Sequence, residues 1–315
     1  MTDNSTVWKM HGLGNQILVV DGRPVDDARQ SAGAGTGGDA GSATSAASVR
    51  QLAGDTTASA LPARLVERLA KREATAFDQL MYLTLPREPG SAATVTIYNM
   101  DGSTAGACGN GMRCVALYEA LRTKQVSNRF DGPDGTIETV VQSQAQIAVD
   151  MGRPKFTWDD IPLAEPFHDT RGIELQIGPI DAPVLHSPSV VNVGNPHAVF
   201  WVDDVDAFDL ERFGPMLENH PTFPDRANIS LAQVMSPEAI RVRTWERGAG
   251  LTQACGSAAC AVTACAIRKK FTGQAVRITL PGGELHVEQQ QDGRLVMVGP
   301  AQLEATGTLA EALGS

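Results

Sequence analysis

The sequence predicts an α+β protein built from a duplicated unit. A cysteine followed by glycine and a small polar residue occurs twice, as Cys108-Gly109-Asn110 and Cys255-Gly256-Ser257, and each motif opens a segment with helical spacing. A Gly-Asn pair with an apolar run after it precedes each motif, at Gly14-Asn15 and Gly194-Asn195. Two motifs repeated in the same order indicate two copies of one structural unit.

The intervals between the motifs agree with a duplication. Asn15 precedes Cys108 by 93 residues, and Asn195 precedes Cys255 by 60. Residues 31–60 are rich in Gly, Ala, Ser and Thr and predict a flexible insertion, whose removal nearly equalises the two intervals. At the matching position, nine residues before each cysteine, the two halves carry Asn99 and Glu246.

Apolar patterning predicts the individual elements. Pro62 opens a segment with one apolar face, typical of a helix, and Asp292-Gly293 predicts a hairpin turn. A proline-rich stretch over 154–188 separates the halves. Strands are predicted by β-branched, aromatic or alternating residues over 6–21 (strand, turn, strand), 80–85, 93–98, 137–141, 147–151, 198–203 and 240–246.

Composition excludes several classes of protein. The formal net charge of −10 over 315 residues argues against nucleic-acid binding and against a basic membrane-binding face. No apolar run reaches the length of a spanning helix, and the N-terminus lacks the order of a signal peptide. Five cysteines, an odd number, argue against a disulfide framework, so we expect a reduced, cytoplasmic protein. The glycine pattern 33–38 lacks the strand and helix of a dinucleotide site.

The two Cys-Gly motifs indicate acid/base chemistry at a carbon atom. A thiol at a helix start sits among backbone N–H groups and a positive dipole end, so its pKa is expected to be lowered. A thiolate on one face of a carbon and a thiol on the other would invert its configuration without a cofactor or metal. The other three cysteines, Cys114, Cys260 and Cys265, lie among Ala and Val and are predicted to be packing residues.

Several motifs together resemble those of the diaminopimelate epimerase family. The resemblance runs in order through both halves, over residues 9–15, 99–103, 108–114, 194–197, 245–250 and 254–257. It implies a cofactor-independent, two-base epimerase that converts LL-2,6-diaminopimelate to the meso form in lysine and peptidoglycan biosynthesis. It also implies a homodimer without nucleic-acid or membrane partners.

The resemblance implies a fold of two pseudo-symmetric lobes. Each lobe would be a mostly antiparallel sheet or barrel around a central helix, with the active site in the cleft between the lobes. We expect an N-terminal lobe over 1–152, joined by 299–315, and a C-terminal lobe over 153–298.

The resemblance also assigns roles to residues. Cys108 and Cys255 would be the acid/base pair, and His197 and Glu246 would support them. Backbone donors to the substrate would come from Gly109, Asn110, Gly256 and Ser257. Side-chain contacts with the substrate would be made by Asn15, Gln79, Asn99, Asn195, Asn228, Glu246 and Arg247. Amides with one Glu and one Arg suit a ligand that carries two ammonium and two carboxylate groups.

Two alternatives remain at this stage. A proline or hydroxyproline racemase would share the two-thiol architecture, although that group usually carries His where Asn110 stands. A non-catalytic amino-acid-binding protein would clasp a carboxylate between two helix ends, but binding alone does not require thiols. A thiol redox protein is disfavoured because no Cys-x-x-Cys occurs, and metal catalysis because the six histidines show no ligand spacing.

Overall fold

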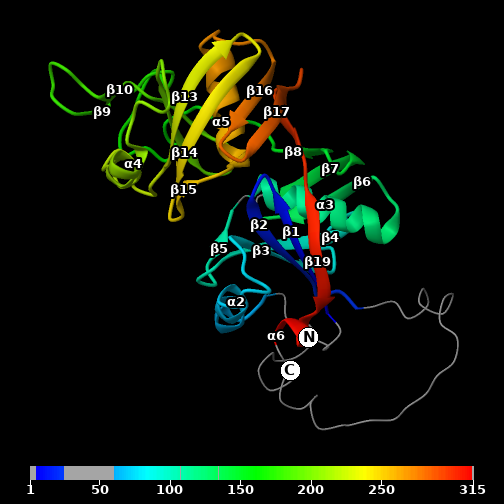
Figure 1. The fold of residues 1–315 in the computed structure, drawn as a ribbon. Coiled ribbons are helices and arrows are strands. Elements are labelled where there is room, and N and C mark those ends of the chain that lie inside the picture. Colours follow the sequence, from blue (N-terminus) through cyan, green and yellow to red (C-terminus); the bar gives the residue numbers. More distant parts are fainter. Residues whose placement is uncertain (1–4, 25–59, 107, 134, 314–315) are drawn as a thin grey trace, which may run out of the picture.

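The computed structural model describes residues 5–24, 60–106, 108–133 and 135–313 (Figure 1). Apart from Ala60, the predicted insertion over 31–60 and its glycine pattern lie outside these residues. Within the described residues, no helix is long and apolar enough to cross a bilayer.

Two sets of elements follow one another along the chain, and we call them the first and the second repeat. The first repeat consists of β1 (Thr6–Gly12), β2 (Asn15–Asp21), α2 (Ala63–Ala70), β3 (Gln79–Thr84), β4 (Ala93–Asn99), β5 (Thr104–Ala105), α3 (Gly109–Thr123), β6 (Ser127–Gly132), β7 (Gly135–Ser143) and β8 (Gln146–Asp150). The second repeat consists of β11 (Ser189–Asn192), β12 (Pro196–Trp201), α4 (Leu210–Glu218), β13 (Asn228–Ser236), β14 (Ala239–Glu246), β15 (Gly250–Thr252), α5 (Gly256–Arg268), β16 (Ala275–Leu280), β17 (Gly283–Gln289) and β18 (Leu295–Gly299).

The strand pairing is the same in both repeats. In the first, β1–β2, β3–β4, β4–β5, β6–β7 and β7–β8 are antiparallel, whereas β2–β3 and β4–β6 are parallel. Adding ten to each strand number gives the pairs of the second repeat, with the same directions. The predicted duplication and the mostly antiparallel sheets are therefore confirmed.

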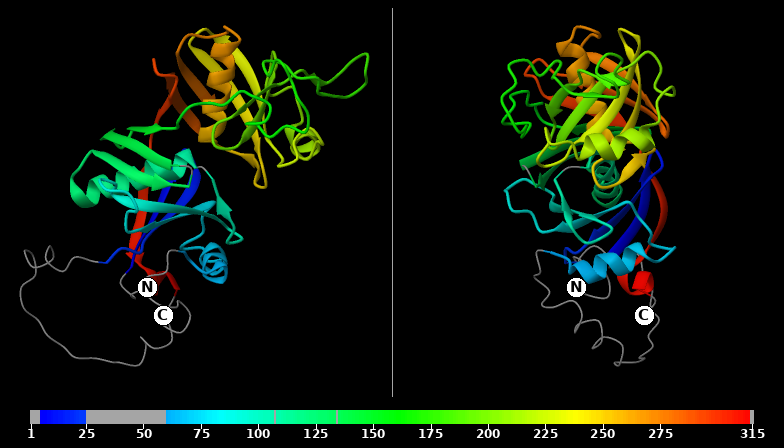
Figure 2. Two further views of the ribbon diagram at one scale, coloured as in Figure 1. Left: turned by 180° about the vertical axis from the view of Figure 1, so that it is seen from behind. Right: turned by 90° about the vertical axis from the view of Figure 1, so that its left-hand side faces the viewer.

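Each cysteine-led helix is the crossover between two parallel strands. The helix α3 contacts β1, β2, β3, β6, β7 and β8, and α5 contacts β11, β12, β13, β16, β17 and β18. Both helices are buried on all sides over most of their length, from Gly109 to Glu119 and from Gly256 to Ala266. A helix that lacks a polar face belongs in a core, so the strands wrap around it (Figures 1 and 2).

Two antiparallel strand pairs connect the second repeat to the first and bring the C-terminal strand back to the first repeat. Strand β18 pairs with β8, and the chain then continues into β19 (Gln302–Thr308), which pairs with β1. A short helix, α6 (Leu309–Leu313), follows β19. The first and the last described elements, β1 and α6, consequently both lie in the part of the molecule formed by the first repeat (Figure 1). Between the repeats, the proline-rich stretch forms turns and the small pair β9 (Gln176–Ile177) and β10 (Leu185–His186).

Most predicted elements are present within a few residues of their predicted bounds. The helix after Pro62 begins at Ala63, and the Asp292-Gly293 turn joins β17 to β18. The sequence did not predict α4, α6, β6, β13, β16 and β19, or the short strands β5, β9, β10 and β15. Helix α4 has nine residues with Pro215 inside, which obscures its helical pattern.

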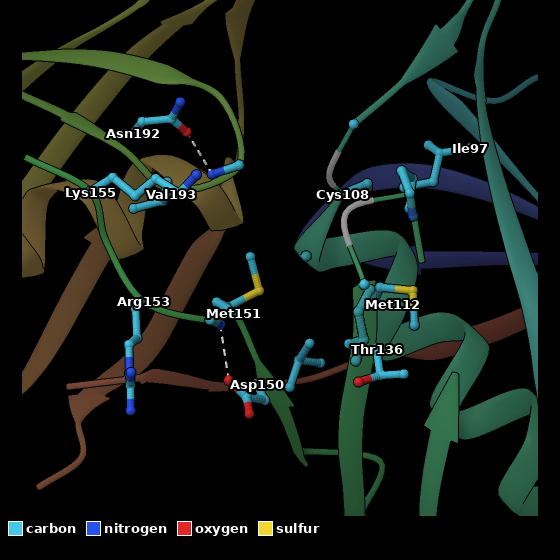
Figure 3. Close-up of a pocket in the computed structure, with 18 residues that line it drawn as sticks. Ile97, Cys108, Met112, Thr136, Asp150, Met151, Arg153, Lys155, Asn192 and Val193 are labelled. Atoms are coloured by element: carbon cyan, nitrogen blue, oxygen red, sulfur yellow. Dashed lines mark hydrogen bonds between the residues drawn. The ribbon is translucent and has the colours of Figure 1, made fainter. Parts of the chain in front are cut away.

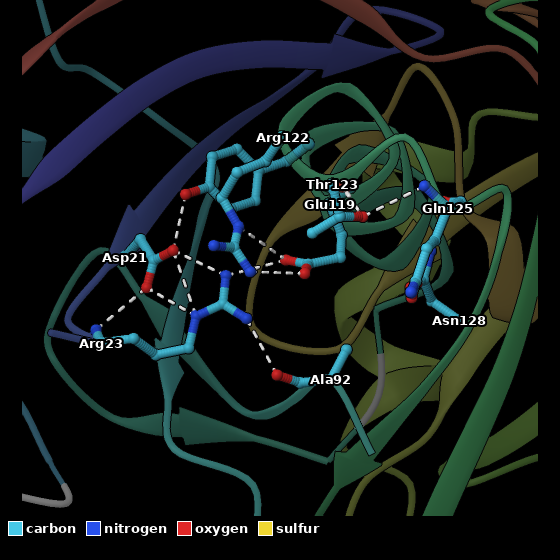
Figure 4. A network of polar contacts seen from close by, with 9 residues as sticks. Asp21, Arg23, Ala92, Glu119, Arg122, Thr123, Gln125 and Asn128 are labelled. Atoms are coloured by element: carbon cyan, nitrogen blue, oxygen red, sulfur yellow. Dashed lines mark hydrogen bonds and ion pairs between the residues drawn. The ribbon is translucent and has the colours of Figure 1, made fainter. Parts of the chain in front are cut away.

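A buried ion network fastens β2 to α3 (Figure 4). Arg23 donates from Nη2 to Asp21 Oδ2 at 2.6 Å and to Glu119 Oε2 at 2.8 Å, and from Nη1 to the Ala92 carbonyl oxygen at 2.9 Å. The Tyr118 hydroxyl donates to Asp21 Oδ2 at 2.6 Å. Burial opposes the ionisation of Asp21, but the hydrogen bonds and charge of Arg23 outweigh burial and lower the pKa of this carboxyl.

We expect Arg23→Ala to lower the free energy of unfolding by about 3–5 kcal/mol, because two buried carboxylates lose their shared cation. Urea denaturation monitored by circular dichroism measures the change. Arg122→Ala is the matched control, since Arg122 pairs with the same Glu119 but its side chain is 44% exposed. The control should cost less than about 1 kcal/mol. Equal losses of unfolding free energy in the two variants would show that the buried pairing of Arg23 with Asp21 and Glu119 does not stabilise the fold more than an exposed ion pair does.

Candidate active site

The N-termini of α3 and α5 meet at the centre of the molecule. Both helices begin with glycine, at Gly109 and Gly256, and each has its cysteine as the extended N-cap residue. A Cβ atom added to Gly256 would lie 3.4 Å from the Cα atom of Gly109. The positive dipole ends of two helices therefore face one region, which favours an anion there.

The side chain of Met297 lies close to the glycine at both helix starts. An added Cβ would lie 2.6 Å from Met297 Cε at Gly109 and 3.0 Å from Met297 Sδ at Gly256. Met297 itself is fully buried in β18. Each helix start therefore packs closely on Met297 with no side chain of its own.

The Cys108 thiol is partly exposed and is held by its own helix. The backbone N–H of Gly111 donates to Cys108 Sγ at 3.1 Å. Burial and, to a smaller extent, the charge of Glu246 raise the pKa of Cys108 to about 12. The Gly111 hydrogen bond and the charge of Arg113 act in the opposite direction. The expectation of a lowered thiol pKa is therefore wrong for the substrate-free protein, because burial outweighs the helix end.

The Cys255 thiol is buried and lies beside Glu246. Its Sγ is 3.4 Å from Ser257 Oγ, and it also forms a hydrogen bond with the Glu246 carboxyl. Burial, and then the charge of Glu246, raise the pKa of Cys255 well above its ordinary value. Burial also raises the pKa of Glu246, whose Oε1 accepts a 2.6 Å hydrogen bond from Thr252 Oγ1. One carboxyl thus influences both thiols.

Asn110 connects the two half-sites. Its Nδ2 donates to Asn15 Oδ1 at 3.2 Å and to the Ala254 carbonyl oxygen, next to Cys255, at 3.0 Å. Asn15 in turn donates to Asp78 Oδ2 at 2.9 Å. Side chains of the first repeat are therefore joined by a hydrogen bond to the backbone of the second repeat, at the residue before Cys255.

A second cluster of amides surrounds His197. The Nε2 atom of this fully buried ring is 2.8 Å from Asn195 Oδ1 and 3.4 Å from Asn228 Nδ2. Burial, and then the charge of Arg247, lower the pKa of His197 to about 3, so the ring is neutral. Asn228 Oδ1 accepts from the backbone N–H of Arg247 at 2.9 Å. The His197 ring thus lies against the side-chain amides of Asn195 and Asn228.

The strand registers place the predicted substrate contacts in equivalent pairs. Gln79 lies opposite Asn99 in the β3–β4 ladder, and the β13–β14 ladder brings Asn228 to the end where Glu246 lies. Parallel pairing sets Ile17 beside Gln79 and His197 beside Asn228. The pairs across the duplication are Asn15 with Asn195, Gln79 with Asn228, Asn99 with Glu246, and Cys108 with Cys255.

A pocket of about 500 Å³ opens beside Cys108 (Figure 3). One wall carries Cys108, Ile97, Met112 and Thr136 of the first repeat. The facing wall carries residues at or after the ends of β8 and β11, namely Asp150, Met151, Arg153, Lys155, Asn192 and Val193. Cys255, Glu246 and Arg247 do not line this pocket, so it gives access to the Cys108 side of the paired helix ends.

Sequence reasoning missed Asp78, Thr252 and Met297. Asp78 has a local signal, since it directly precedes Gln79. Thr252 lies only six residues after Glu246. Met297 has no local signal, because it contacts the helix starts from a distant part of the chain. The three cysteines predicted as packing residues, Cys114, Cys260 and Cys265, are buried, and all five cysteines are free.

Comparison with known proteins assigns the family. The family model for diaminopimelate epimerase matches residues 48–157 and 189–304. A protein named diaminopimelate epimerase from Brucella anthropi is 49% identical over 100% of this chain and 94% of its own length. Another of that name, from Afipia carboxidovorans, is 51% identical over 96% of this chain and 94% of its own length. The chain belongs to the diaminopimelate epimerase family.

Solved structures agree with the fold. A hydroxyproline epimerase from Agrobacterium vitis has a TM-score of 0.62 at 15% identity, covering 98% of this chain and 93% of that one. A predicted epimerase from Pseudomonas aeruginosa has a TM-score of 0.57 at 17% identity, covering 96% and 98%. At such identities these likenesses concern the fold alone. The family assignment therefore confirms the predicted epimerase, and it gives no support to the racemase alternative.

We expect Gly256→Ala to lower kcat/KM for epimerisation by at least about tenfold, because the new methyl group separates the two helix starts and small misplacements at a reacting centre are costly. Gly273→Ala is the matched control, since a Cβ there meets nothing within 4 Å. Activity and circular dichroism should both be measured. Unchanged kcat/KM in a folded Gly256→Ala protein would show that the close approach is not needed.

Proposed function

We propose that this protein epimerises LL-2,6-diaminopimelate to meso-diaminopimelate with Cys108 and Cys255 as a two-base pair and without a cofactor. The observation that carries the proposal is the meeting of two cysteine-capped helix N-termini at Gly109 and Gly256. An amino acid whose carboxylate lies between these helix ends would have its α-carbon between the two thiols.

The helix ends bind and activate the substrate carboxylate. Backbone N–H groups of Gly109–Asn110 and Gly256–Ser257 point into one region from two positive dipole ends. Removing the α-proton sends negative charge into the carboxylate, and preorganised N–H donors stabilise that charge. Glu246, beside both thiols, is the acceptor suited to the α-ammonium group.

The two thiols exchange one proton each with the α-carbon. The thiolate takes the α-proton from one face, and the electron pair of the broken C–H bond delocalises into the carboxylate. The opposite thiol then donates its proton to the other face, which inverts the configuration and leaves the protonation states of the pair exchanged. Burial excludes water, which would otherwise stabilise the thiolate and weaken it as a base.

The amides and Arg247 suit the distal end of the substrate. Asn15, Gln79, Asn99 and Asn195 are part-exposed around the thiols, and Asn228 holds the backbone of Arg247. Amides bind ammonium and carboxylate groups alike, and a guanidinium pairs with a carboxylate. We assign His197 to the orientation of Asn195 and Asn228.

We also propose limits for the two lobes, a homodimeric assembly and a cytoplasmic location. The N-terminal lobe covers 1–152 and 299–315, supported by the β19–β1 pairing, and the C-terminal lobe covers 153–298. The homodimer is supported by the family resemblance. A cytoplasmic location is supported by five free cysteines, which are typical of a reducing compartment.

Isotope exchange tests the reaction. With reductant and no added cofactor, LL-diaminopimelate in D₂O should gain deuterium at one α-carbon as the meso form appears, measured by NMR and chiral chromatography. Cys108→Ala and Cys255→Ala should each abolish epimerisation, and Cys265→Ala, which changes a cysteine at the far end of α5, should retain it. Neither exchange nor epimerisation in the folded wild-type protein would refute the proposal, and exchange with free proline would favour the racemase.

The pH dependence follows from the raised thiol pKa values. The active form needs one thiolate, and both pKa values lie above the ordinary value of about 8.5. Rising pH therefore creates the active form, and kcat/KM should increase between pH 7 and pH 9 by up to about tenfold per unit. A profile that is flat or falls over this range would contradict the raised values.

A further inference from the structure

A chain of hydrogen bonds runs from a buried cation to a carboxylate through two side-chain amides. Arg113 Nη2 donates to Asn110 Oδ1 at 2.8 Å, and Asn110 Nδ2 donates to Asn15 Oδ1 at 3.2 Å. Asn15 Nδ2 then donates to Asp78 Oδ2 at 2.9 Å. We call these four residues the amide relay. It joins α3 to the start of β2 and to the residue before β3.

The two ends of the relay fix the orientation of both amides. A guanidinium group can only donate hydrogen bonds, and a carboxylate can only accept them. Asn110 therefore directs its oxygen toward Arg113. Its NH2 group donates to Asn15 Oδ1 and, at 3.0 Å, to the Ala254 carbonyl oxygen, so both hydrogen atoms are used. Asn15 in turn directs its NH2 group toward Asp78, because the reverse orientation would place two oxygen atoms in contact.

The cationic end of the relay is anchored in the fold. Arg113 is fully buried, and its Nε donates to the Pro300 carbonyl oxygen at 3.0 Å. A Cβ added to Gly12 would lie 2.9 Å from Arg113 Nη2, and one added to Gly299 would lie 3.3 Å from Nε. Among the described residues, the hydrogen-bond partners of Arg113 are all neutral. A buried cation with neutral partners is costly to desolvate, which indicates a role beyond packing.

The acidic end of the relay is held against the turn that carries Asn15. The backbone N–H of Gln16 donates to Asp78 Oδ2 at 2.7 Å, and the backbone N–H of Asp78 donates to the Gln16 carbonyl oxygen at 2.8 Å. These bonds fix the carboxylate beside the Asn15 side chain. The second repeat has Ala227 at the matching position before Asn228, so this carboxylate belongs to the first half-site alone.

The relay leaves Asn15 with an N–H group to offer. Its oxygen accepts from Asn110, and one hydrogen atom of its NH2 group is donated to Asp78. Among the described residues, the second hydrogen atom has no acceptor, and the residue is only half-buried. Asn15 is therefore suited to donate to a carboxylate, whereas an ammonium group would need the oxygen that is already engaged.

The matching amide of the second repeat has the same orientation through a different contact. Asn195 Oδ1 lies 2.8 Å from His197 Nε2, and a carbonyl oxygen can only accept, so this ring nitrogen carries the hydrogen atom. The NH2 group of Asn195 has no acceptor in the described parts of the chain. Both halves of the site thus engage the amide oxygen within the protein and leave amide N–H groups for a ligand.

We propose that Arg113 and Asp78 are positioning residues that fix Asn15 as a hydrogen-bond donor to the distal carboxylate of the substrate. The proposal rests on the proposed function, in which Asn15 contacts the distal end of diaminopimelate. Arg113 and Asp78 act through the orientation of the two amides and do not contact the substrate themselves.

Two substitutions of Asn15 test which group of the substrate it contacts. Both are made together with Asp78→Asn, so that no variant has two facing carboxylates. Asn15→Ala removes the donor and should raise KM for LL-diaminopimelate about tenfold or more, with kcat changed less than about threefold, because the contact is remote from the reacting carbon. Asn15→Asp adds a negative charge and should raise KM further. A contact with the ammonium group predicts the opposite order. Initial rates of epimerisation measure both constants.

Substitutions at the two ends of the relay test the positioning. Asp78→Leu removes the acceptor and leaves the Asn15 amide free to turn over, so KM should rise at least about fivefold. Asp78→Asn keeps an oxygen atom for the same donors and should hold KM within about twofold of the wild-type value. Arg113→Met and Arg113→Lys form the corresponding pair at the buried end. A structural role alone would lower the melting temperature without separating KM from kcat.

Melting temperatures test the relay without substrate. Asn15→Asp sets a carboxylate against Asp78 and should lower Tm, and adding Asp78→Asn should recover at least half of that loss because it removes the repulsion. Gln125→Glu is the matched control, since it makes the same amide-to-carboxylate change on an exposed residue after α3. The control should change neither Tm nor KM.

Three results would overturn the proposal. The first is a lower KM with Asn15→Asp than with Asn15→Ala. The second is an unchanged KM in Asp78→Leu, which is decisive even if the Arg113 variants do not fold, since Asp78 is exposed. The third is a Tm loss in Asn15→Asp that Asp78→Asn does not reduce. Absence of epimerisation by the wild-type protein would refute the proposed function instead, and the Tm comparison, which needs no substrate, would still decide the orientation of the amides.

Discussion

The close approach of two helix N-termini is the constraint on which the rest of this structure depends. Helices α3 and α5 start side by side, with glycine after each cysteine and with the side chain of Met297 packed against both glycines. Two positive dipole ends would repel each other in an empty interior. The arrangement is favourable when an anion lies between them, and a substrate carboxylate supplies one.

Burying two thiols at this place has an electrostatic consequence. Burial raises both thiol pKa values, so the positive helix ends do not by themselves make a thiolate. The same burial makes a thiolate, once formed, a stronger base, because it is poorly solvated. The charge of Glu246 raises the pKa of both thiols in addition to burial.

The duplication explains both the similarity and the difference of the two half-sites. Identical strand pairing places an amide at the turn of the first hairpin, a polar residue at the start of the strand that pairs in parallel with this hairpin, and a cysteine at the start of the crossover helix. Substitution within that frame then distinguished the halves, with Asn99 against Glu246 and Arg113 against Cys260. The segment over 31–60 lies between β2 and α2, on a connection that needs no fixed length to keep the frame.

The sequence by itself determined the repeated unit, the cysteine-led helices and most strands, because glycine, turn residues and apolar periodicity act locally. It also placed the candidate site residues, since their motifs recur in order. Only the tertiary structure decided the thiol pKa values, the isolation of Arg113 and the contacts of Asp78, Thr252 and Met297. Burial and charge pairing depend on residues far apart in the chain. A local sequence pattern therefore does not show whether an ionisable side chain will have a partner of opposite charge in the folded protein.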